Sequence, residues 1–293
     1  MCTLLIAYLP SYFDHSEYNC NHKRIWPWLI YWSGWKYIFK YFSPQLICTN
    51  KDTIQIFSSG KQHILVSHPH GVASYNHFLL MTDAVEFHTN YIKKSTHRRE
   101  LIANILFRIP GLRELTLWLG CIDAGKRVAE NTLSHGYSIQ VYPGGEHEQL
   151  LSNPIQPILV INKRKGIARL ALKYNVCIIP TFTFGEDQTY KTYTSLLPLQ
   201  LWLSQQFKIA LTAATGRFYI PFLPYQQQLT TVIGAPIQLP SRKNMVQNSS
   251  GMYDYTDDEV VELLELYKKS ITGLFDEYKD KYSKYQINTI KIV

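Results

Sequence analysis

Residues 63–71 read HILVSHPHG, and this stretch decides which fold we expect. Its first five residues form a short apolar run rich in β-branched side chains, which is typical of a buried strand. Similar runs, bounded by Pro, Gly or His, predict further strands at 138–142 (SIQVY), 176–183 (VCIIPTFT) and 230–234 (TTVIG). The neighbouring segments predict helices at 97–109, 127–133, 166–174 and 257–281. This alternation predicts an α/β sandwich with a largely parallel central sheet.

The composition is that of a folded, basic protein. The chain has 293 residues, of which 46% are hydrophobic and 18% charged, and its formal net charge is +8. This charge favours an acidic partner, such as nucleic acid, an anionic membrane surface or a phosphorylated cofactor. Zinc-finger spacing, basic heptads and an RRM signature are absent, whereas 21 Tyr and 6 Trp suit the boundary of water and lipid. We therefore expect a surface-active protein that does not bind nucleic acid.

The cysteines predict neither a disulfide framework nor a structural zinc site. The five cysteines, at 2, 20, 48, 121 and 177, are scattered and form no CxxC pair. A reducing compartment is therefore expected.

Residues 25–42 (IWPWLIYWSGWKYIFKYF) hold four Trp, several other aromatic residues and only two Lys. Such a segment suits a membrane interface, and a helix packed on the protein's own core explains it equally well. The apolar residues 2–9 fall well short of the ~20 residues that span a bilayer. They also lack the flanking features of a signal peptide.

Two polar loops follow predicted strands directly, where α/β folds place their functional groups. In the first, Pro69 separates His68 from His70, and Gly71 lets the chain turn sharply with its amide exposed. Two imidazoles beside a Gly amide can serve as a general base next to an oxyanion site. A metal-binding HxH pair and two histidines that only satisfy backbone carbonyls are the other interpretations, although the HxHxDH metal pattern is incomplete here.

The second loop, GGEHE at 144–148, pairs Gly144 and Gly145 with the carboxylate of Glu148. Paired glycines allow a ligand to approach the backbone, but a Gly-Gly turn also occurs for purely geometric reasons. Further along, Lys163, Arg164 and Lys165 precede a predicted helix that begins near Gly166. Three cations beside exposed helix amides suit a phosphate, and a solvated basic turn is the ordinary alternative.

Taken together, these segments resemble the type-2 diacylglycerol acyltransferase family, which includes monoacylglycerol and wax-alcohol acyltransferases. The similarity extends over roughly residues 25–283. The motifs that carry it are, in order, YFSPQL at 41–46, HPHG at 68–71, PGLRE at 110–114, GGEHE at 144–148, NKRKGIARLAL at 162–172, PTFTFGE at 180–186, GR at 216–217, TTVIGAPIQLP at 230–240 and LYKKSITGLFDEYKDKY at 266–282.

The resemblance implies a glycerolipid-acyltransferase-like sandwich in an enzyme that esterifies a neutral lipid hydroxyl with acyl-CoA, most simply diacylglycerol to triacylglycerol. Acyl-CoA is a co-substrate, and neither a permanently bound cofactor nor a metal is expected. The implied location is the endoplasmic reticulum membrane, with the catalytic domain facing the cytosol, and also lipid droplets. Residues 1–42 would associate with the membrane and 43–293 would form the acyltransferase domain. The oligomeric state is left open.

The chain departs from the wider glycerolipid acyltransferases, in which an Asp five positions after the catalytic His orients it. Ala73 and Tyr75 occupy the two corresponding positions here, so Glu148 is the candidate orienting carboxylate. GGEHE also carries bulky Glu146 and His147 where the family has small residues, which could reshape the pocket. Of the family's hydrophobic N-terminal hairpin, only a remnant is visible at 2–13.

The resemblance assigns a role to each candidate residue. His70 is the general base, Glu148 orients it, and His68 shapes the site. Gly71 or the Gly144 and Gly145 turn supplies oxyanion amides, and Arg164, Lys165 and Gly166 bind the coenzyme A phosphates. A monoacylglycerol, long-chain alcohol or sterol acceptor is an alternative to diacylglycerol. Other classes are a catalytically inactive lipid-binding or lipid-droplet protein and a metal-dependent hydrolase.

Overall fold

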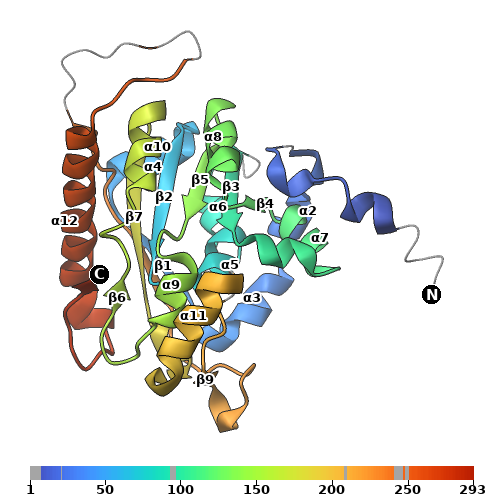
Figure 1. Ribbon diagram of the computed structural model, residues 1–293, viewed down its shortest axis with the longest axis vertical. Coiled ribbons are helices and arrows are strands. Elements are labelled where there is room, and N and C mark those ends of the chain that lie inside the picture. Colours follow the sequence, from blue (N-terminus) through green and yellow to red (C-terminus); the bar gives the residue numbers. More distant parts are fainter. Residues whose placement is uncertain (1–7, 21, 93–96, 208–209, 241–246, 248–250) are drawn as a thin grey trace.

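The computed structural model describes residues 8–20, 22–92, 97–207, 210–240, 247 and 251–293 (Figure 1). Within these residues, seven strands form one sheet in the order β1-β10-β7-β2-β5-β3-β4. Its strands are β1 (Gln45–Cys48), β2 (His63–His68), β3 (Arg98–Ile102), β4 (Cys121–Asp123), β5 (Ser138–Val141), β7 (Cys177–Phe184) and β10 (Thr230–Ile233). In this sheet, as far as the chain is described, β10 and β7 pair antiparallel and the other neighbouring strands pair parallel. The predicted mixed α/β fold with a largely parallel sheet is thus confirmed.

Helices cover both faces of this sheet. One face carries α8 (Lys126–Ser134), α10 (Gly166–Tyr174) and α12 (Asp257–Tyr282). The opposite face carries α4 (Lys51–Ser59), α5 (Tyr75–Met81) and α6 (Phe87–Asn90). Successive residues of a strand point to opposite faces. Accordingly, Ile64 and Val66 of β2 belong to the first core, whereas Leu65 belongs to the second.

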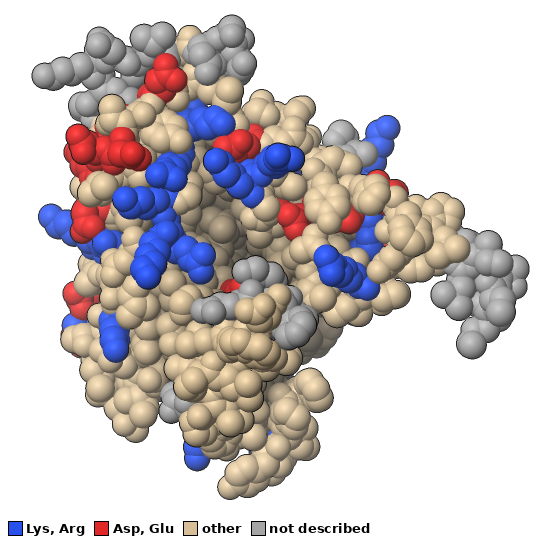
Figure 2. Space-filling model, viewed as in Figure 1, with Lys and Arg blue, Asp and Glu red and all other residues tan. Residues whose placement is uncertain are grey.

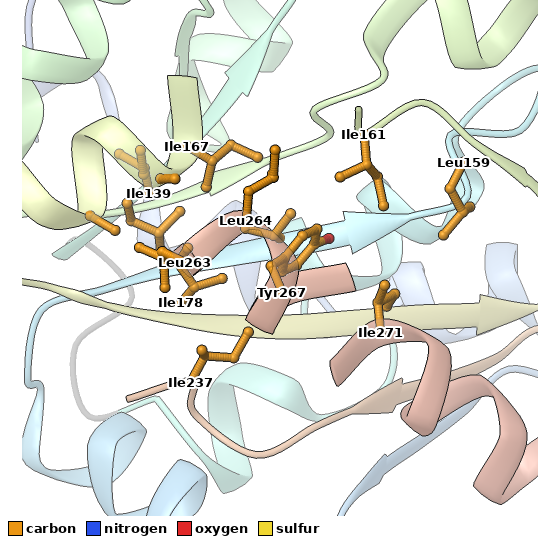
Figure 3. Close-up of a cluster of buried hydrophobic side chains, with 14 of the residues drawn as sticks. Ile139, Leu159, Ile161, Ile167, Ile178, Ile237, Leu263, Leu264, Tyr267 and Ile271 are labelled. Carbon is orange, nitrogen blue, oxygen red and sulfur yellow. The ribbon is translucent and has the colours of Figure 1, made fainter. Parts of the chain in front are cut away.

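The long helix α12 closes the first core, and Figure 3 shows its side chains against those of the strands. Its buried residues recur every three or four positions, which aligns one apolar stripe with the sheet. Thr256 caps the helix by accepting from the amide of Glu259, whose side chain accepts in return from the amide of Thr256. The apolar stripe and this capping box explain why a single helix forms over these 26 residues.

Shorter elements join or extend these layers. The remaining α-helices are α2 (Pro27–Ile30), α3 (Gly34–Phe39), α7 (Leu112–Trp118), α9 (Gly145–Leu150) and α11 (Leu197–Phe207). The 3-10 helices are η1 (Ser16–Tyr18), η2 (His22–Arg24), η3 (Lys40–Phe42), η5 (Asn104–Arg108), η6 (Asp187–Thr189), η7 (Thr194–Leu196) and η8 (Arg217–Tyr219). Two small sheets pair β6 (Ile158–Leu159) with β11 (Lys291–Ile292), and β8 (Lys191–Thr192) with β9 (Ala214–Thr215).

One predicted element is wrong. The helix expected at 97–109 is strand β3 followed by the short helix η5. Two charged residues of β3 are buried as a pair, with Nη2 of Arg98 2.7 Å from Oε1 of Glu100. A buried ion pair interrupts the apolar pattern by which a strand is recognised, and this is why the sequence predicted a helix instead. The other three predicted helices and all four predicted strands are present within two residues at either end.

The aromatic segment 25–42 forms α2, α3 and η3. Ile30 and Phe42 are buried in the core, which agrees with a segment packed on the protein itself. Trp28 and Tyr37 are exposed, so the segment also offers aromatic surface. Residues 1–7 and 21 of the predicted membrane-associating segment lie outside the described residues.

Among the helices of the described part of the chain, none combines the length and the apolar character needed to cross a membrane.

Candidate active site

The two polar loops meet at one edge of the sheet. Strand β2 ends at His68, and its parallel neighbour β5 ends at Val141, with Val66 in register with Val141. The carboxyl ends of parallel strands lie at the same edge, so residues 68–71 and the loop at 142–148 are brought together. The structure thus assembles His68, His70, Gly71, Gly144, Gly145 and Glu148 in one place.

Glu148 is the fixed centre of this cluster. Its side chain is buried, and Nδ1 of His68 lies 2.9 Å from Oε1 and 3.0 Å from Oε2. The amides of His70 and Val160 donate to the same carboxylate at 2.8 and 2.9 Å. Burial opposes ionisation, but His68 and these donors prevail and hold the pKa of Glu148 below its ordinary value. The ionised Glu148 carboxylate therefore links His68 at the end of β2 to the backbone of His70.

The orienting contact expected between Glu148 and the His70 ring differs from the one observed. Glu148 binds the His68 ring and only the main chain of His70. Strand β2 ends at His68 and the chain turns at Gly71, so the His70 ring meets Gly71 and Ser74 instead.

The His70 ring makes its shorter contacts through Nδ1, whereas its Nε2 lies 3.4 Å from Oγ of Ser74. Its Nδ1 lies 3.0 Å from the carbonyl oxygen of Gly71 and 2.9 Å from Oγ of Ser74. A carbonyl only accepts, so we assign the proton to Nδ1, which leaves the lone pair on Nε2. The Ser74 hydroxyl donates to the His70 carbonyl at 2.9 Å and can therefore accept from Nδ1. The ring of Tyr142 lies edge-on, 5.7 Å away between centroids.

The same surroundings keep His70 neutral. Burial, more than any other cause, lowers the pKa of His70 below its ordinary value, although the Gly71 hydrogen bond and the Glu148 charge oppose it. His77 and His68 lower the pKa further. A neutral imidazole with its lone pair on Nε2 is the form that accepts a proton.

A second buried carboxylate, Glu186, was missed by the sequence analysis. It follows β7, and the amides of Tyr75 and Asn76 both donate to it at 2.9 Å. Gly71 has φ of +63°, and a Cβ there would lie 2.5 Å from Cγ of Glu186. Burial raises the pKa of Glu186 to about 8. The available signal was its place, as FGE at 184–186, directly after a predicted strand.

Asp187 is buried beside it but faces another way. Oγ of Ser152 and the hydroxyl of Tyr285 donate to its carboxylate at 2.6 and 2.8 Å. Burial raises the pKa of Asp187 to about 7. These contacts join the segment after α9 to the C-terminal segment, so we interpret Asp187 as structural.

His70 lines an apolar cavity of about 560 Å³. Its wall also holds Ser74, Tyr142 and Glu146, and the rest is mainly apolar. The apolar lining residues are Val72, Ala73, Phe78, Met81, Leu101, Ile102, Ala103, Ile105, Leu106, Ile109, Ala124, Val141 and Ala210. A volume and lining of this kind suit a hydrocarbon chain.

A second cavity of about 500 Å³ adjoins the first and is basic. The two cavities share six lining residues, namely Leu101, Ala124, Val141, Tyr142, Gly145 and Glu146. The cationic residues of the second are Lys126, Lys163, Arg164, Arg169 and Lys173. Figure 2 shows Lys and Arg gathered beside a hollow on this face.

Of the predicted phosphate-binding residues, two line this cavity and one lies outside it, exposed to solvent. Arg164 and Gly166 line the basic cavity, and Nη2 of Arg164 donates to the carbonyl of Gly144 at 3.2 Å. Lys165 is exposed at the start of α10 and is not among the lining residues. The described residues contain no group of three or more His, Cys, Asp or Glu side chains placed to hold a metal ion.

Comparison with known proteins identifies the family. The family model described as diacylglycerol acyltransferase matches residues 1–292. The chain belongs to the diacylglycerol acyltransferase family. The resemblance inferred from the HPHG, GGEHE and other motifs is therefore confirmed.

Individual members of the family are similar over most of the chain. Diacylglycerol O-acyltransferase 2-like protein 6 of Mus musculus is 28% identical over 91% of this chain and 79% of its own length. Diacylglycerol O-acyltransferase 2B of Umbelopsis ramanniana is 27% identical, over 88% and 74%. The 2-acylglycerol O-acyltransferase 1 of Mus musculus is 28% identical, over 95% and 82%.

A crystal structure of the 1-acyl-sn-glycerophosphate acyltransferase PlsC from Thermotoga maritima is also similar. It covers 82% of this chain and 76% of its own, with a TM-score of 0.46 and 12% identity. At that TM-score the likeness carries no argument about function.

As a member of the diacylglycerol acyltransferase family, this chain is an acyltransferase that acts on neutral lipids. The relatives are named for different acyl acceptors, diacylglycerol and 2-acylglycerol. The comparisons therefore establish the class of reaction, and the acceptor is a matter for proposal.

Proposed function

We propose that this chain transfers an acyl group from acyl-CoA to the hydroxyl of diacylglycerol and so forms triacylglycerol. The observation that carries the proposal is the place of His70, which lines the apolar cavity next to a cavity lined by five cationic and two acidic side chains. An acyl-CoA molecule has the same two parts, an apolar chain and a phosphorylated nucleotide, joined at the thioester. Bound across both cavities, it would place its thioester near their shared wall at Tyr142 and Gly145.

The proton path starts at Nε2 of His70. This nitrogen removes the proton from the acceptor hydroxyl while the hydroxyl oxygen attacks the thioester carbonyl carbon. The tetrahedral intermediate then collapses, the C–S bond breaks, and the coenzyme A thiolate takes the proton back from the His70 imidazolium. No covalent acyl-enzyme is needed, and no further reactant is consumed.

Neighbouring groups support this step without taking the proton. Glu148 fixes the main chain of His70 and holds the fully buried His68, which shapes the site. The negative charge on the intermediate would be met by the amides of Gly71 or Gly144, because the Gly145 amide already donates to the carbonyl of Tyr142 at 3.0 Å. One such donor is typically worth about 3 kcal/mol in the transition state.

The coenzyme A phosphates would bind the cationic side chains of the second cavity. Arg164 and Lys163 lie at its edge before α10, with Gly166 at the start of the helix. Guanidinium groups suit phosphate because they donate paired hydrogen bonds. Acyl-CoA is thus a co-substrate, and the proposal requires no permanently bound cofactor.

We also propose that the enzyme works at a membrane of the endoplasmic reticulum, with residues 43–293 as a catalytic domain facing the cytosol, and at lipid droplets. Residues 1–42 would help to attach it. The support is chemical, because a neutral lipid acceptor lies in a lipid phase and the chain is basic and rich in exposed aromatic side chains.

Monoacylglycerol and long-chain alcohols are alternative acceptors, since an apolar cavity suits each of them. A protein of this family that binds lipid without catalysis is the alternative outside the enzyme class. The decisive experiment is an acyl-transfer assay with labelled oleoyl-CoA and a panel of acceptors, with and without chelator. We expect ester formation from diacylglycerol that chelator does not affect. Absence of ester with every acceptor would overturn the proposal.

A further inference from the structure

The segment 190–225 presents a group of exposed apolar side chains that the proposed reaction does not use. Phe222 is 90% exposed, Tyr219 79% and Phe218 70%. We call this group the aromatic face, and its members are Tyr193, Leu196, Leu199, Trp202, Leu211, Phe218, Tyr219, Ile220 and Phe222. Exposed apolar groups of this size usually mark a place of contact with another molecule.

The loop that carries the most exposed of these residues is held in shape by its own backbone. The amide of Arg217 donates to the carbonyl of Leu223 at 2.7 Å, and the amide of Gly216 donates to that of Ile220 at 3.2 Å. Phe218 and Tyr219 both have left-handed backbone, with φ of 56° and 62°. Aromatic residues rarely adopt this conformation, so the closed loop, and not local preference, keeps the two rings pointing outward.

Charge in this region has one sign only. From residue 190 to residue 229 the sequence contains two Lys and one Arg but no Asp or Glu. Two cations lie over rings of the aromatic face. Cζ of Arg217 is 4.8 Å from the centroid of Phe218, and Nζ of Lys191 is 5.8 Å from that of Tyr193.

The N-terminal aromatic segment continues this surface. The hydroxyl of Tyr41 donates to the carbonyl of Pro224 at 2.8 Å, which joins η3 to the end of the loop. Residues 18–51 also contain no Asp or Glu, and they include five Lys and Arg. One of these cations, Lys36, forms an ion pair with Glu86 at 2.7 Å. In Figure 1 both α3 and β9 lie in the lower half of the view, and Figure 2 shows few charged residues near the lower end of the face drawn.

We propose that the aromatic face docks on a phospholipid layer with anionic headgroups. Aromatic rings flanked by cations suit the boundary between headgroups and acyl chains, whereas acidic residues would be repelled there. The inference rests on the proposed transfer to a neutral lipid, because that acceptor must leave a lipid layer to reach His70. Helix α11 packs against α9, and Ala210 lines the apolar cavity, so docking would hold the cavity close to the layer.

The test compares two triple variants of the full chain. Phe218→Ser, Tyr219→Ser and Phe222→Ser together remove the most exposed rings of the loop. The matched control combines Val261→Ser, Leu266→Ser and Ile287→Ser, which are exposed apolar residues outside the aromatic face. Flotation with vesicles of phosphatidylcholine and phosphatidylserine measures binding, and vesicles of phosphatidylcholine alone report the contribution of charge.

We expect the loop variant to bind the mixed vesicles about tenfold more weakly than the wild type, the control to bind normally, and pure phosphatidylcholine to bind the wild type less. Wild-type binding by the loop variant would overturn the proposal. The proposal would also be overturned if neither protein binds vesicles and the wild type is a dimer while the loop variant is a monomer. The aromatic face would then join two copies of the chain.

An activity measurement separates this inference from the proposed function. With a water-soluble short-chain diacylglycerol, the loop variant should esterify the acceptor as fast as the wild type. With long-chain diacylglycerol in mixed vesicles, it should lose most of its rate. If the wild type esterifies neither acceptor but still binds vesicles through the loop, the proposed function fails and the docking surface stands. Equal rates for loop variant and wild type on vesicles would overturn the role in acceptor delivery.

Discussion

The Nδ1 atom of His68 lies 2.9 Å from Oε1 of Glu148, and both side chains are buried. The same carboxylate accepts from the main-chain amide of His70. Glu148 therefore sets the position of His70 through the backbone, while its side chain contacts the His68 ring.

Glu148→Gln should lower kcat by about 10²-fold and change the KM for acyl-CoA little. The glutamine side chain has the same shape, but its NH2 group would face one of the two backbone amides that donate to Glu148. The resulting small displacement of a catalytic group typically lowers the rate about 10²-fold. Glu146→Gln is the matched control, since Glu146 lines the cavities without binding either histidine. Steady-state kinetics on both variants decide the matter. A larger fall in kcat with Glu146→Gln than with Glu148→Gln would show that Glu148 is not the carboxylate that positions His70.

The pH dependence of kcat/KM should show an acid limb below pH 6.5. The base must be neutral, and burial holds the pKa of His70 below its ordinary value of 6.5. The rate should therefore stay constant as pH falls to about 6.5 and decrease only below it. A midpoint above pH 6.5 would mean that another group, or a charged His70, limits the reaction.

Glu186 should make the folded state less stable as pH rises. The pKa of Glu186 is about 8 in the folded chain, whereas its ordinary value, which applies to the unfolded chain, is 4.5. Between these two pH values the folded chain therefore binds one more proton than the unfolded chain. The contribution of Glu186 to the free energy of unfolding is therefore fully present below about pH 4.5 and is lost as pH rises towards 8. Thermal unfolding should show a smaller fall in Tm between about pH 6 and pH 8.5 for Glu186→Gln than for the wild type. Glu277→Gln, on the exposed side of α12, should keep the wild-type slope.

Arg164→Ala should raise the KM for acyl-CoA about tenfold and change kcat less. Contacts with phosphates far from the thioester act equally on substrate and transition state. A charge-assisted hydrogen bond contributes about 1.5 to 3 kcal/mol, and added salt should weaken it. Lys165→Ala, which alters an exposed cation outside the cavity, is the control. If Arg164→Ala weakens acyl-pantetheine as much as acyl-CoA, the coenzyme phosphates bind elsewhere.

The sequence predicted the sheet because four of its strands are short, largely apolar runs rich in β-branched residues. It also predicted that HPHG and GGEHE meet, because both follow parallel strands. It did not predict β3, where Arg98 and Glu100 are charged but buried as a pair. Such pairing depends on contacts between distant segments, and no local pattern reports it.

The candidate site was predicted in its membership but not in all of its contacts. Which ring Glu148 binds depends on the turn at Gly71, where the backbone becomes left-handed and the His70 ring meets Ser74. Glu186 was missed because its side chain serves the fold by accepting hydrogen bonds from two backbone amides. Amides leave no trace in the sequence, so a carboxylate that binds them is indistinguishable there from a surface residue.

The central claim is that His70 carries the proton of the acceptor hydroxyl, and the rate of ester formation by His70→Ala tests it most directly. The measurement uses labelled oleoyl-CoA and diacylglycerol, with equal amounts of wild type and variant that show the same Tm. Loss of a general base should lower the rate by about 10²- to 10⁴-fold. A variant that keeps more than about a tenth of the wild-type rate would contradict the account, because no general base contributes so little.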